Sequence, residues 1–533
     1  MARRVPPPAD LLILLLSALL LFVGLGSNSA QNEDEARYAL AAQEMLASGD
    51  WIEPTVQGEP WWNKAPLRVW TNAVLGSVFG FDLWTIRIPS ALAGLAVVAL
   101  MLWLGRLWGD ARTGRWAAVL LVTSTHFLYV HGARTGEMES LLLLLWLATM
   151  AFATKAHDDE RWALAAAVTL GLVGMAKHAA YVVPVGGVLL VFWWRSGLLA
   201  RLRARTWILG ALIVLAIVVP WHAILAHRHP DFLAVYFGEQ VAGRVEEHVV
   251  RSEPGLFALR VVKDALFPWI LWIPFLLIVR REIVDRVRGI DLTLGVWVAG
   301  MVVATAASRL DLAWYVLPAV PAVALWAARR FSSARVPVWT GVVASQLLLL
   351  SPSNVLEFDL IHTRSMWGGI GVQVLGTLRG FHGWWVQTAF AVLALVVLLA
   401  PRNVPARRRV HWALVTWAAF AFLHAALPLR DAFAPGPLEE LAAEIRRSGH
   451  GAVIVHDREL PPSDLIAYTL QQQGVDYVVR ANDAPDVDAF SGVRWIVGPF
   501  EQLRVLREPD ASMVRAEWAA IPPDLAPPHT VPR

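Results

Sequence analysis

The sequence contains no cysteine among its 533 residues. This absence excludes a disulfide framework, a thiolate nucleophile, a zinc site with cysteine ligands and an iron–sulfur cluster. Charged residues are also scarce, because Asp, Glu, Lys and Arg make up 17% of the chain, whereas about 25% is usual in soluble proteins. The net charge of +3 is small for this length and argues against a nucleic-acid partner. Any chemistry must therefore use carboxylates, histidine, lysine, arginine or a bound substrate.

Long apolar runs take the place of the missing charge, and the mean hydropathy is +0.50. Crossing a hydrocarbon core of about 30 Å takes roughly 20 helical residues, and a charge near its centre costs about 2.5 to 3.5 kcal/mol. The sequence therefore predicts a multi-pass α-helical membrane protein with about 13 transmembrane helices, and it excludes a soluble enzyme. The expected spans are the charge-free runs 9–28, 86–105, 116–131, 138–154, 162–176, 179–194, 206–225, 264–279, 290–307, 312–328, 336–352, 384–401 and 410–427.

Lysine and arginine gather in alternate short connections between these runs. Cytoplasmic loops carry an excess of both residues, so the connections rich in them are expected inside the cell. The intervening segments 29–85 and 226–263 contain few basic residues and many carboxylates and aromatics. We therefore expect these two loops, together with the C-terminal tail, to face the extracytoplasmic side.

The composition changes near residue 429, where charges return and Pro435-Gly436-Pro437 indicates a linker. The tail then alternates between helical spacing and short buried-strand runs, which predicts a small α/β domain. The expected helices are 438–447 and 465–473, and the expected strands are 452–455, 477–479 and 495–497. The chain is thus predicted to have a transmembrane domain at 1–428, with outer loops 29–85 and 226–263, and a soluble extracytoplasmic α/β accessory domain at 429–533.

The first outer loop opens with the carboxylates of Glu33, Asp34 and Glu35 at the start of an amphipathic helix. Two interpretations fit this pattern. Carboxylates favour the positive end of the helix dipole, so they could simply cap an interfacial helix. Alternatively, Asp34 is a general base, and Arg37, one turn later, binds an anionic group beside it.

Further cations lie in the expected outer loops. They are Arg37, Lys64, Arg134, Lys177, Arg244 and Arg309. We expect them to converge on one face of the membrane, although Lys64 and Lys177 also suit snorkelling to the interface. A cluster of cations on the outer side implies an anionic lipid headgroup or a phosphate, and the adjacent carboxylates imply an acceptor to be deprotonated.

These strings resemble those of a known family. Asp34-Glu35-Ala36-Arg37-Tyr38, Gly49-Asp50-Trp51 and the stretch Trp61 to Pro66 resemble the first outer loop of polyprenyl-phosphate-sugar glycosyltransferases. These are C-type (GT-C) glycosyltransferases, which include protein O-mannosyltransferases and the aminoarabinose transferases of lipid A. Arg134 with Glu139 is similar to the second acidic motif of the family, and Met175-Ala176-Lys177 is similar to its Thr-Lys-Gly turn. The resemblance covers residues 10 to about 330, and the tail only loosely.

The resemblance implies inverting transfer of a sugar from a polyprenyl-phosphate donor to a lipid, glycan or protein acceptor at the outer face of the bacterial inner membrane. The implied catalytic residues are Asp34, Glu35 and Glu139. The implied donor-phosphate residues are Arg37, Lys64, Arg134, Lys177 and Arg244. The implied substrate pocket contains Tyr38, Trp62, Asn63, Glu239 and Tyr315. If the acceptor is itself a phosphate, Asp34 is expected to orient the sugar and not to act as a base.

A metal cofactor stays an open question at this point. The family commonly has a metal-coordinating Glu where this sequence has Asn63, so a family-type divalent-cation site is in doubt and no metal ligand is assigned. Two rival functions are a transporter or flippase of lipid-linked sugars, and a scaffold that presents the α/β tail. A transporter is expected to show midplane charges, broken helices or repeats, and a scaffold leaves the clustered ionisable loops without a role.

Overall fold

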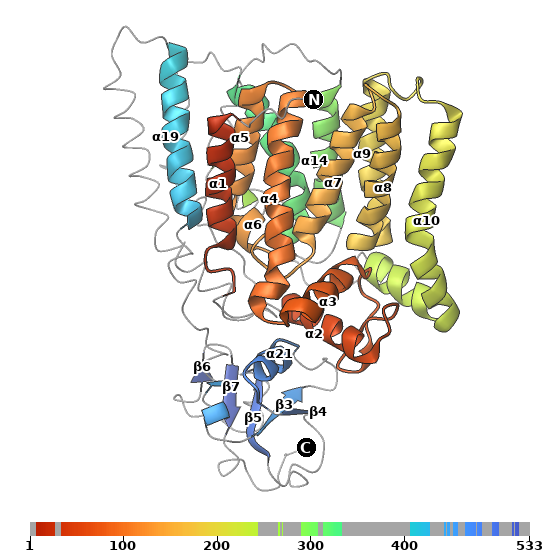
Figure 1. Ribbon diagram of the computed structural model, residues 1–533, viewed down its shortest axis with the longest axis vertical. Coiled ribbons are helices and arrows are strands. Elements are labelled where there is room, and N and C mark those ends of the chain that lie inside the picture. Colours follow the sequence, from red (N-terminus) through yellow and green to blue (C-terminus); the bar gives the residue numbers. More distant parts are fainter. Residues whose placement is uncertain are drawn as a thin grey trace.

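The computed structural model is mostly helical, with a bundle of helices at one end and a small sheet at the other (Figure 1). The residues that it describes are 7–26, 33–243, 265–266, 269, 289–307, 313–332, 406–426, 442–443, 445–447, 451–456, 464–475, 477–481, 493–499, 514–515 and 518–521.

Most of the apolar runs in the described residues form helices where the sequence predicts them, but the predicted span 116–131 is divided between a helix that ends at Val122 and a five-residue helix that begins at Thr125. The bundle contains α1 (Pro8–Phe22), α4 (Leu83–Leu107), α5 (Ala111–Val122), α6 (Thr125–Tyr129), α7 (Glu139–Lys155), α8 (Arg161–Ala176), η1 (Ala179–Tyr181), α9 (Val182–Arg195), α10 (Ala204–Arg228), α14 (Ile290–Ala307), η4 (Ala313–Ala319), α15 (Val320–Phe331) and α19 (Ala406–Ala426). The predicted spans 336–352 and 384–401 lie outside the described residues, as does most of 264–279. Within the described residues, α4 and α10 are long and apolar enough to cross a membrane, and α1, α8, α9 and α14 include shorter apolar helices. The count of about 13 transmembrane helices stays a prediction.

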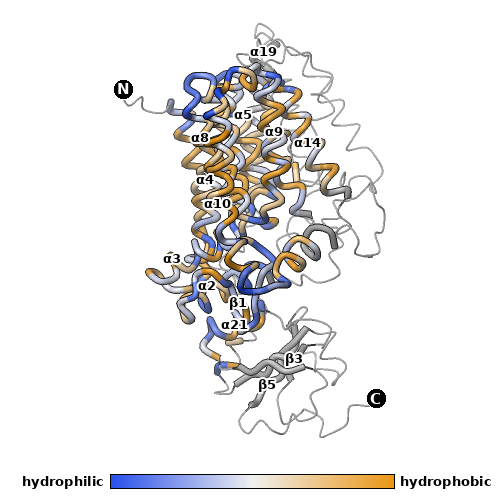
Figure 2. Tube along the Cα trace, turned by 90° about the vertical axis from the view of Figure 1, so that its right-hand side faces the viewer, coloured by the Kyte–Doolittle hydropathy of each residue, from blue (hydrophilic) through white to orange (hydrophobic). Residues whose placement is uncertain are grey.

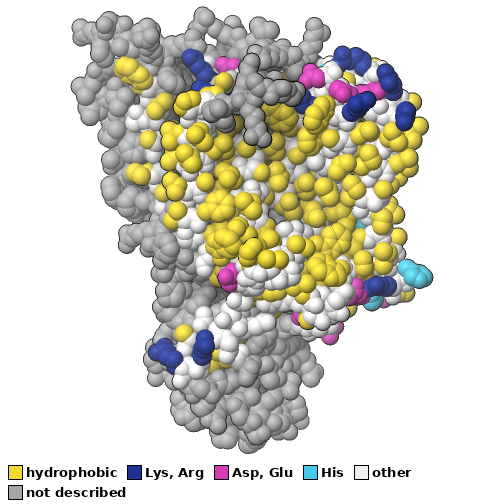
Figure 3. Space-filling model, viewed as in Figure 1, with side chains coloured by type: hydrophobic (Ala, Val, Ile, Leu, Met, Phe, Trp, Pro, Cys, Tyr) yellow, Lys and Arg dark blue, Asp and Glu magenta, His cyan; other side chains and the backbone are white. Residues whose placement is uncertain are grey.

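The outer faces of the bundle are apolar. Leu12, Leu15 and Leu19 of α1 are each more than half exposed, and Leu212 and Leu215 of α10 are exposed to the same degree. Figure 2 shows hydrophobic residues along the length of the helices, and Figure 3 shows hydrophobic side chains over the middle of one face with charges toward its ends. Exposed apolar surface of this extent is typical of a protein that contacts lipid.

Buried polar contacts and small residues fix the helices against one another. Asp10 of α1 is 1% exposed and pairs with Arg106 of α4 and Arg115 of α5. Helices α4 and α5 approach so closely that a Cβ at Gly105 would lie 2.5 Å from the Cα atom of Gly114. Such contacts leave these helices few alternative arrangements.

Two helices and a hairpin lie between the bundle and the C-terminal sheet (Figure 1). The sequence predicts the first helix, α2 (Glu33–Ser48), but not α3 (Leu67–Phe79) or the hairpin of β1 (Thr55–Val56) and β2 (Glu59–Pro60). Gln57 and Gly58 both have positive φ, as a two-residue type I′ turn requires. The carboxylate of Glu44 accepts hydrogen bonds from both of their backbone amides, so α2 fixes this turn.

The C-terminal part contains a five-stranded sheet in the order β4-β3-β5-β7-β6. Its elements are β3 (Gly451–His456), α21 (Asp464–Gln472), β4 (Tyr477–Ala481), β5 (Val493–Pro499), β6 (Val514–Arg515) and β7 (Trp518–Ile521). Strand β3 pairs in parallel with β4 and β5, whereas β7 pairs antiparallel with β5 and β6. The three predicted strands and the helix 465–473 are confirmed, β6 and β7 were not predicted, and helix 438–447 is described only in part. The domain boundaries stay a prediction.

Candidate active site

Asp34 lies in the first turn of α2, and its side chain is 20% exposed. The Arg37 Nη1 atom donates to Asp34 Oδ1 at 3.1 Å. Burial alone would raise the pKa of Asp34, but the positive charges of Arg37, Lys64 and Lys177 hold it below its ordinary value. Asp34 is therefore ionised at neutral pH, and three of the expected cations, Arg37, Lys64 and Lys177, act on it.

Lys177 and Glu139 form a buried ion pair beside this carboxylate. The Lys177 Nζ atom lies 2.8 Å from Glu139 Oε1, and both side chains are less than 10% exposed. Burial alone would lower the pKa of Lys177, but Glu139 and the nearby Tyr181 and Tyr315 raise it. The ammonium also lies 5.2 Å from the centre of the Tyr315 ring. The structure thus brings together Glu139, Lys177 and Tyr315, which the sequence selects from three separate loops.

Lys64 belongs to the same group. Its positive charge is one of the causes that lower the pKa of Asp34. The backbone amide of the next residue, Ala65, donates to the carbonyl of Lys177 at 3.1 Å. This hydrogen bond ties the Lys64 segment to the Lys177 turn, so the two lysines come to the site together.

The predicted pocket residues are divided between two neighbouring clusters. Tyr38 is buried, its hydroxyl donates to the Met138 sulfur at 3.3 Å, and burial together with the charge of Asp34 raises its pKa. Trp62 packs instead on His229, with ring centres 4.7 Å apart, and on Phe232. Asn63 is partly buried between Trp62 and Lys64. Arg244 and the side chain of Glu239 lie outside the described residues, as does Arg309, so their predicted roles are untested.

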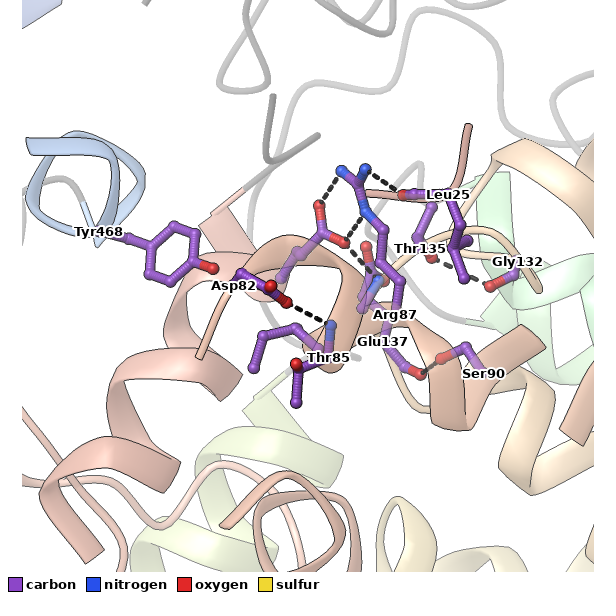
Figure 4. A network of polar contacts seen from close by, with 12 residues as sticks. Leu25, Asp82, Thr85, Arg87, Ser90, Gly132, Thr135, Glu137 and Tyr468 are labelled. Atoms are coloured by element: carbon purple, nitrogen blue, oxygen red, sulfur yellow. Dashed lines mark hydrogen bonds and ion pairs between the residues drawn. The ribbon is translucent and has the colours of Figure 1, made fainter. Parts of the chain in front are cut away.

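Glu35 differs from the expected supporting acid. Its side chain is fully buried, and Arg87 of α4 donates to it from Nε at 2.7 Å and from Nη2 at 2.9 Å. The Gly136 amide donates to the same carboxylate, while Arg87 Nη1 donates to the Leu25 carbonyl at 2.9 Å (Figure 4). Since Arg87 and Gly136 occupy its oxygens, we assign Glu35 to holding α2 against α4 and the loop that contains Gly136.

Arg134 is also occupied elsewhere. It is 5% exposed, and it donates to the carbonyls of Leu20 and Val23 at 2.5 and 2.8 Å. These carbonyls lie at the C-terminal end of α1, where helices leave acceptors without intrahelical partners. This geometry assigns Arg134 to capping α1, and not to the donor phosphate that the resemblance implies.

His131 and Glu137 belong to the site, although the sequence reasoning did not select them. His131 has a φ of 50°, and its ring stacks on Trp314 with centres 3.7 Å apart. Its Nδ1 atom contacts the Glu137 carboxylate, and burial lowers the pKa of His131 to about 4, so the imidazole is neutral. The available signal was their position in the same short loop as Glu139.

One group of side chains could hold a metal ion among the described residues. Asp34, His131 and Glu137 each offer a ligand atom, and these atoms lie within 4.8 Å of one another. Two carboxylates and a neutral imidazole suit a divalent cation such as Zn²⁺ or Mn²⁺. Since Lys64 and Lys177 oppose a cation electrostatically, an anionic ligand would be needed to balance the added charge.

Comparisons with known proteins show what the chain is similar to. The family model of dolichyl-phosphate-mannose-protein mannosyltransferases matches residues 15–236. An undecaprenyl phosphate-alpha-4-amino-4-deoxy-L-arabinose arabinosyl transferase from Pseudomonas savastanoi pv. phaseolicola is 31% identical over 255 residues, which cover 46% of this chain and 47% of the relative. The transferase of the same name from Pectobacterium carotovorum is 26% identical, over 72% of this chain and 70% of its own. The chain thus spans about half the length of the first of these relatives.

A solved structure shares the fold. The crystal structure of ArnT from Cupriavidus metallidurans bound to undecaprenyl phosphate has a TM-score of 0.73 at 21% identity, and the match covers 97% of this chain and 99% of that one. This likeness shows that the chain shares the mostly helical fold of that protein. The predicted resemblance to polyprenyl-phosphate-sugar glycosyltransferases is therefore confirmed, whereas the individual site residues keep the status of predictions.

Proposed function

We propose that this chain transfers a sugar from a polyprenyl-phosphate donor to an acceptor at the outer face of the membrane, with inversion at the anomeric carbon. The single observation that carries the proposal is the ionised Asp34 among Arg37, Lys64 and Lys177. The relatives support it, because their names specify an undecaprenyl-phosphate sugar as the donor.

The cations suit the leaving group of this reaction. As the bond between the sugar and the phosphate breaks, the phosphate oxygen takes the electron pair and develops negative charge. Fixed positive groups stabilise such charge most effectively where water is excluded. We assign phosphate binding to Lys64, Arg37 and Lys177, and Glu139 already neutralises part of the Lys177 charge.

The state of Asp34 bears on the acceptor. A carboxylate with a lowered pKa is a weak base toward a sugar or side-chain hydroxyl, because proton-transfer efficiency follows basicity. An acceptor that is already ionised, such as a phosphate, needs no base and attacks the anomeric carbon directly. The low pKa therefore favours an anionic acceptor, with Asp34 orienting the sugar by accepting hydrogen bonds from its hydroxyl groups.

We further propose that any divalent-cation requirement involves Asp34, His131 and Glu137, since Asn63 offers no carboxylate where the family commonly has one. A bound cation would supply additional positive charge for the leaving phosphate. The residues of this chain would hold it through one histidine nitrogen and two carboxylates. Direct binding of Mn²⁺ tests this assignment independently of transfer.

We also propose that the chain is integral to the inner membrane, with segments 29–85 and 226–263 and the C-terminal part outside. Helices α2 and α3 lie at the same end of the bundle as the C-terminal sheet, which supports a common side for them (Figure 1). Reporter fusions at Gly58 and Gly474 are expected to give extracytoplasmic signals. A cytoplasmic signal at either position would contradict this topology.

The experiment that tests the function uses purified protein in nanodiscs. It is incubated with candidate polyprenyl-phosphate sugars and acceptors, and the released polyprenyl phosphate and the glycosylated product are identified by mass spectrometry. A transferase forms the released polyprenyl phosphate and the glycosylated product in equal amounts. A flippase moves the intact donor between leaflets without releasing polyprenyl phosphate, and a scaffold does neither.

A further inference from the structure

Asp464 connects the C-terminal part of the chain to the helix that carries Asp34. It is the first residue of α21 and is 4% exposed. Its Oδ2 atom accepts from Arg37 Nε at 2.6 Å, and its Oδ1 atom accepts from Gln57 Nε2 at 2.8 Å. The Asp464 carboxylate, 430 positions after Asp34, therefore contacts the arginine that also pairs with Asp34.

The ion pair is part of a wider contact between α21 and the outer helices. Ile466, Ala467 and Leu470 of α21 belong to one buried cluster with Ala36 and Leu40 of α2. The Tyr468 hydroxyl donates to the Phe81 carbonyl at 3.0 Å, and Figure 4 shows the Tyr468 side chain directed toward the turn that precedes α4. Apolar burial thus holds α21 on α2, and the polar contacts fix the register of the two helices.

Arg37 bridges the two aspartates. Its Nη1 atom faces Asp34 at 3.1 Å, while its Nε atom faces Asp464 at 2.6 Å. The guanidinium is planar and rigid, so the hydrogen bond at Nε sets the direction in which Nη1 points. The charge of Asp464 also offsets part of the positive charge that Arg37 presents to Asp34.

We propose that Asp464 is a positioning residue for the active site, acting through Arg37, so that the C-terminal part belongs to the catalytic unit. The inference rests on the proposed function of Asp34. It replaces the accessory role expected from the sequence, because the region that lacks catalytic motifs supplies a contact to the active-site helix.

Asp464→Asn and Asp464→Glu test the proposal, with Tyr468→Phe as the matched control. Tyr468 lies in the same helix, and its hydroxyl donates to the Phe81 carbonyl, outside α2. We expect Asp464→Asn to lower kcat about 10-fold with a KM for the donor within about threefold of wild type. Asp464→Glu should recover most of the rate, and Tyr468→Phe should stay within about twofold.

A double-mutant cycle separates positioning from general stabilisation. In an Arg37→Gln background, Asp464→Asn should lower kcat no further, since the residue through which it acts is gone. Tyr468→Phe should have the same small effect in either background. A full, additive loss from Asp464→Asn in the Arg37→Gln protein would overturn the proposal, as would a wild-type rate in Asp464→Asn alone.

Hydrogen–deuterium exchange of the peptide covering residues 33–48 gives a readout that does not depend on transfer. Asp464→Asn should increase exchange in the first turns of α2, and the increase should be absent when Arg37→Gln is already present. If the wild-type protein releases no polyprenyl phosphate, the proposed function fails while the exchange cycle still decides the positioning role. Unchanged exchange in Asp464→Asn would refute the positioning role by itself.

Discussion

Glu35→Gln distinguishes a structural acid from a catalytic one. In the structure the Glu35 carboxylate is fully buried and accepts two hydrogen bonds from Arg87 and one from the Gly136 amide. The amide side chain of glutamine has one oxygen in place of two, so it cannot accept both Arg87 bonds. Arg87 is itself 1% exposed, so the substitution removes the Glu35 carboxylate charge from a buried guanidinium.

Breaking one partner of such a buried pair typically costs about 3 to 5 kcal/mol. A destabilisation of this size corresponds to a fall in Tm of roughly 10 °C for a chain of a few hundred residues. Thermal unfolding in detergent, followed by the fluorescence of the 27 tryptophans, measures it directly. The double variant Glu35→Gln with Arg87→Met should recover part of the loss, because it removes both charges together.

The result that would refute this reasoning is equally specific. A Glu35→Gln protein with an unchanged Tm and a rate at least 100-fold lower would make Glu35 a catalytic acid, as the sequence first suggested. Since unfolding also lowers the rate, the activity of Glu35→Gln should be measured below its Tm and expressed per folded protein.

Three further predictions concern the same region. Arg134→Gln should lower stability by about 1.5 to 3 kcal/mol through its lost bonds to the end of α1, with donor affinity within about twofold; a selective loss of donor affinity in a stable protein would return Arg134 to the phosphate site. Gly136→Ala should destabilise the protein by about 1 to 3 kcal/mol, because the added Cβ would lie 2.7 Å from Glu35 Cγ. A Gly136→Ala protein with the same Tm as wild type would contradict this packing. Mn²⁺, titrated by electron paramagnetic resonance with polyprenyl phosphate present, should bind wild type at least 10-fold more tightly than Glu137→Gln; equal binding would remove the Asp34, His131 and Glu137 group as a cation site.

Much of the fold could be predicted because a bilayer imposes simple rules. Charge-free runs delimit the helices, and the separation of α8 from α9 at Lys177 and His178 is correct. Helix α3 was missed because its interior carries Arg68, Asn72 and small residues that interrupt the apolar pattern. Strands β6 and β7 are short, with only two and four residues, and offered too little periodicity to detect.

The site was predicted in part for a related reason. Asp34, Lys64, Glu139 and Lys177 were selected because ionisable residues beside apolar runs are conspicuous, and they interact in the structure through the Lys177–Glu139 ion pair and the charges that act on Asp34. The same signal cannot separate Glu35 from its neighbour Asp34. The Glu35 side chain turns toward the buried Arg87, and the Asp34 side chain turns toward Arg37. Only the packing of α2 on α4 decides this difference.

Helix α21 illustrates a contact that sequence patterns could not give. Its helical spacing was visible, but its partner on α2 lies more than 400 positions away in the sequence. The residues next to Asp464 in the sequence do not indicate that its carboxylate contacts Arg37. Contacts of this kind follow only from the three-dimensional arrangement of the two parts.

The central claim is that Asp34, within its group of cations, is the centre of sugar transfer from a polyprenyl-phosphate donor. The most direct measurement compares wild type, Asp34→Asn and Lys64→Gln for release of polyprenyl phosphate and for donor affinity in nanodiscs. We expect Asp34→Asn to lose roughly 10²-fold in rate with donor affinity nearly unchanged, because the sugar is no longer held in its reactive orientation. We expect Lys64→Gln to weaken donor affinity roughly 10- to 150-fold. A well-folded Asp34→Asn protein that transfers sugar within a few-fold of the wild-type rate would contradict the account.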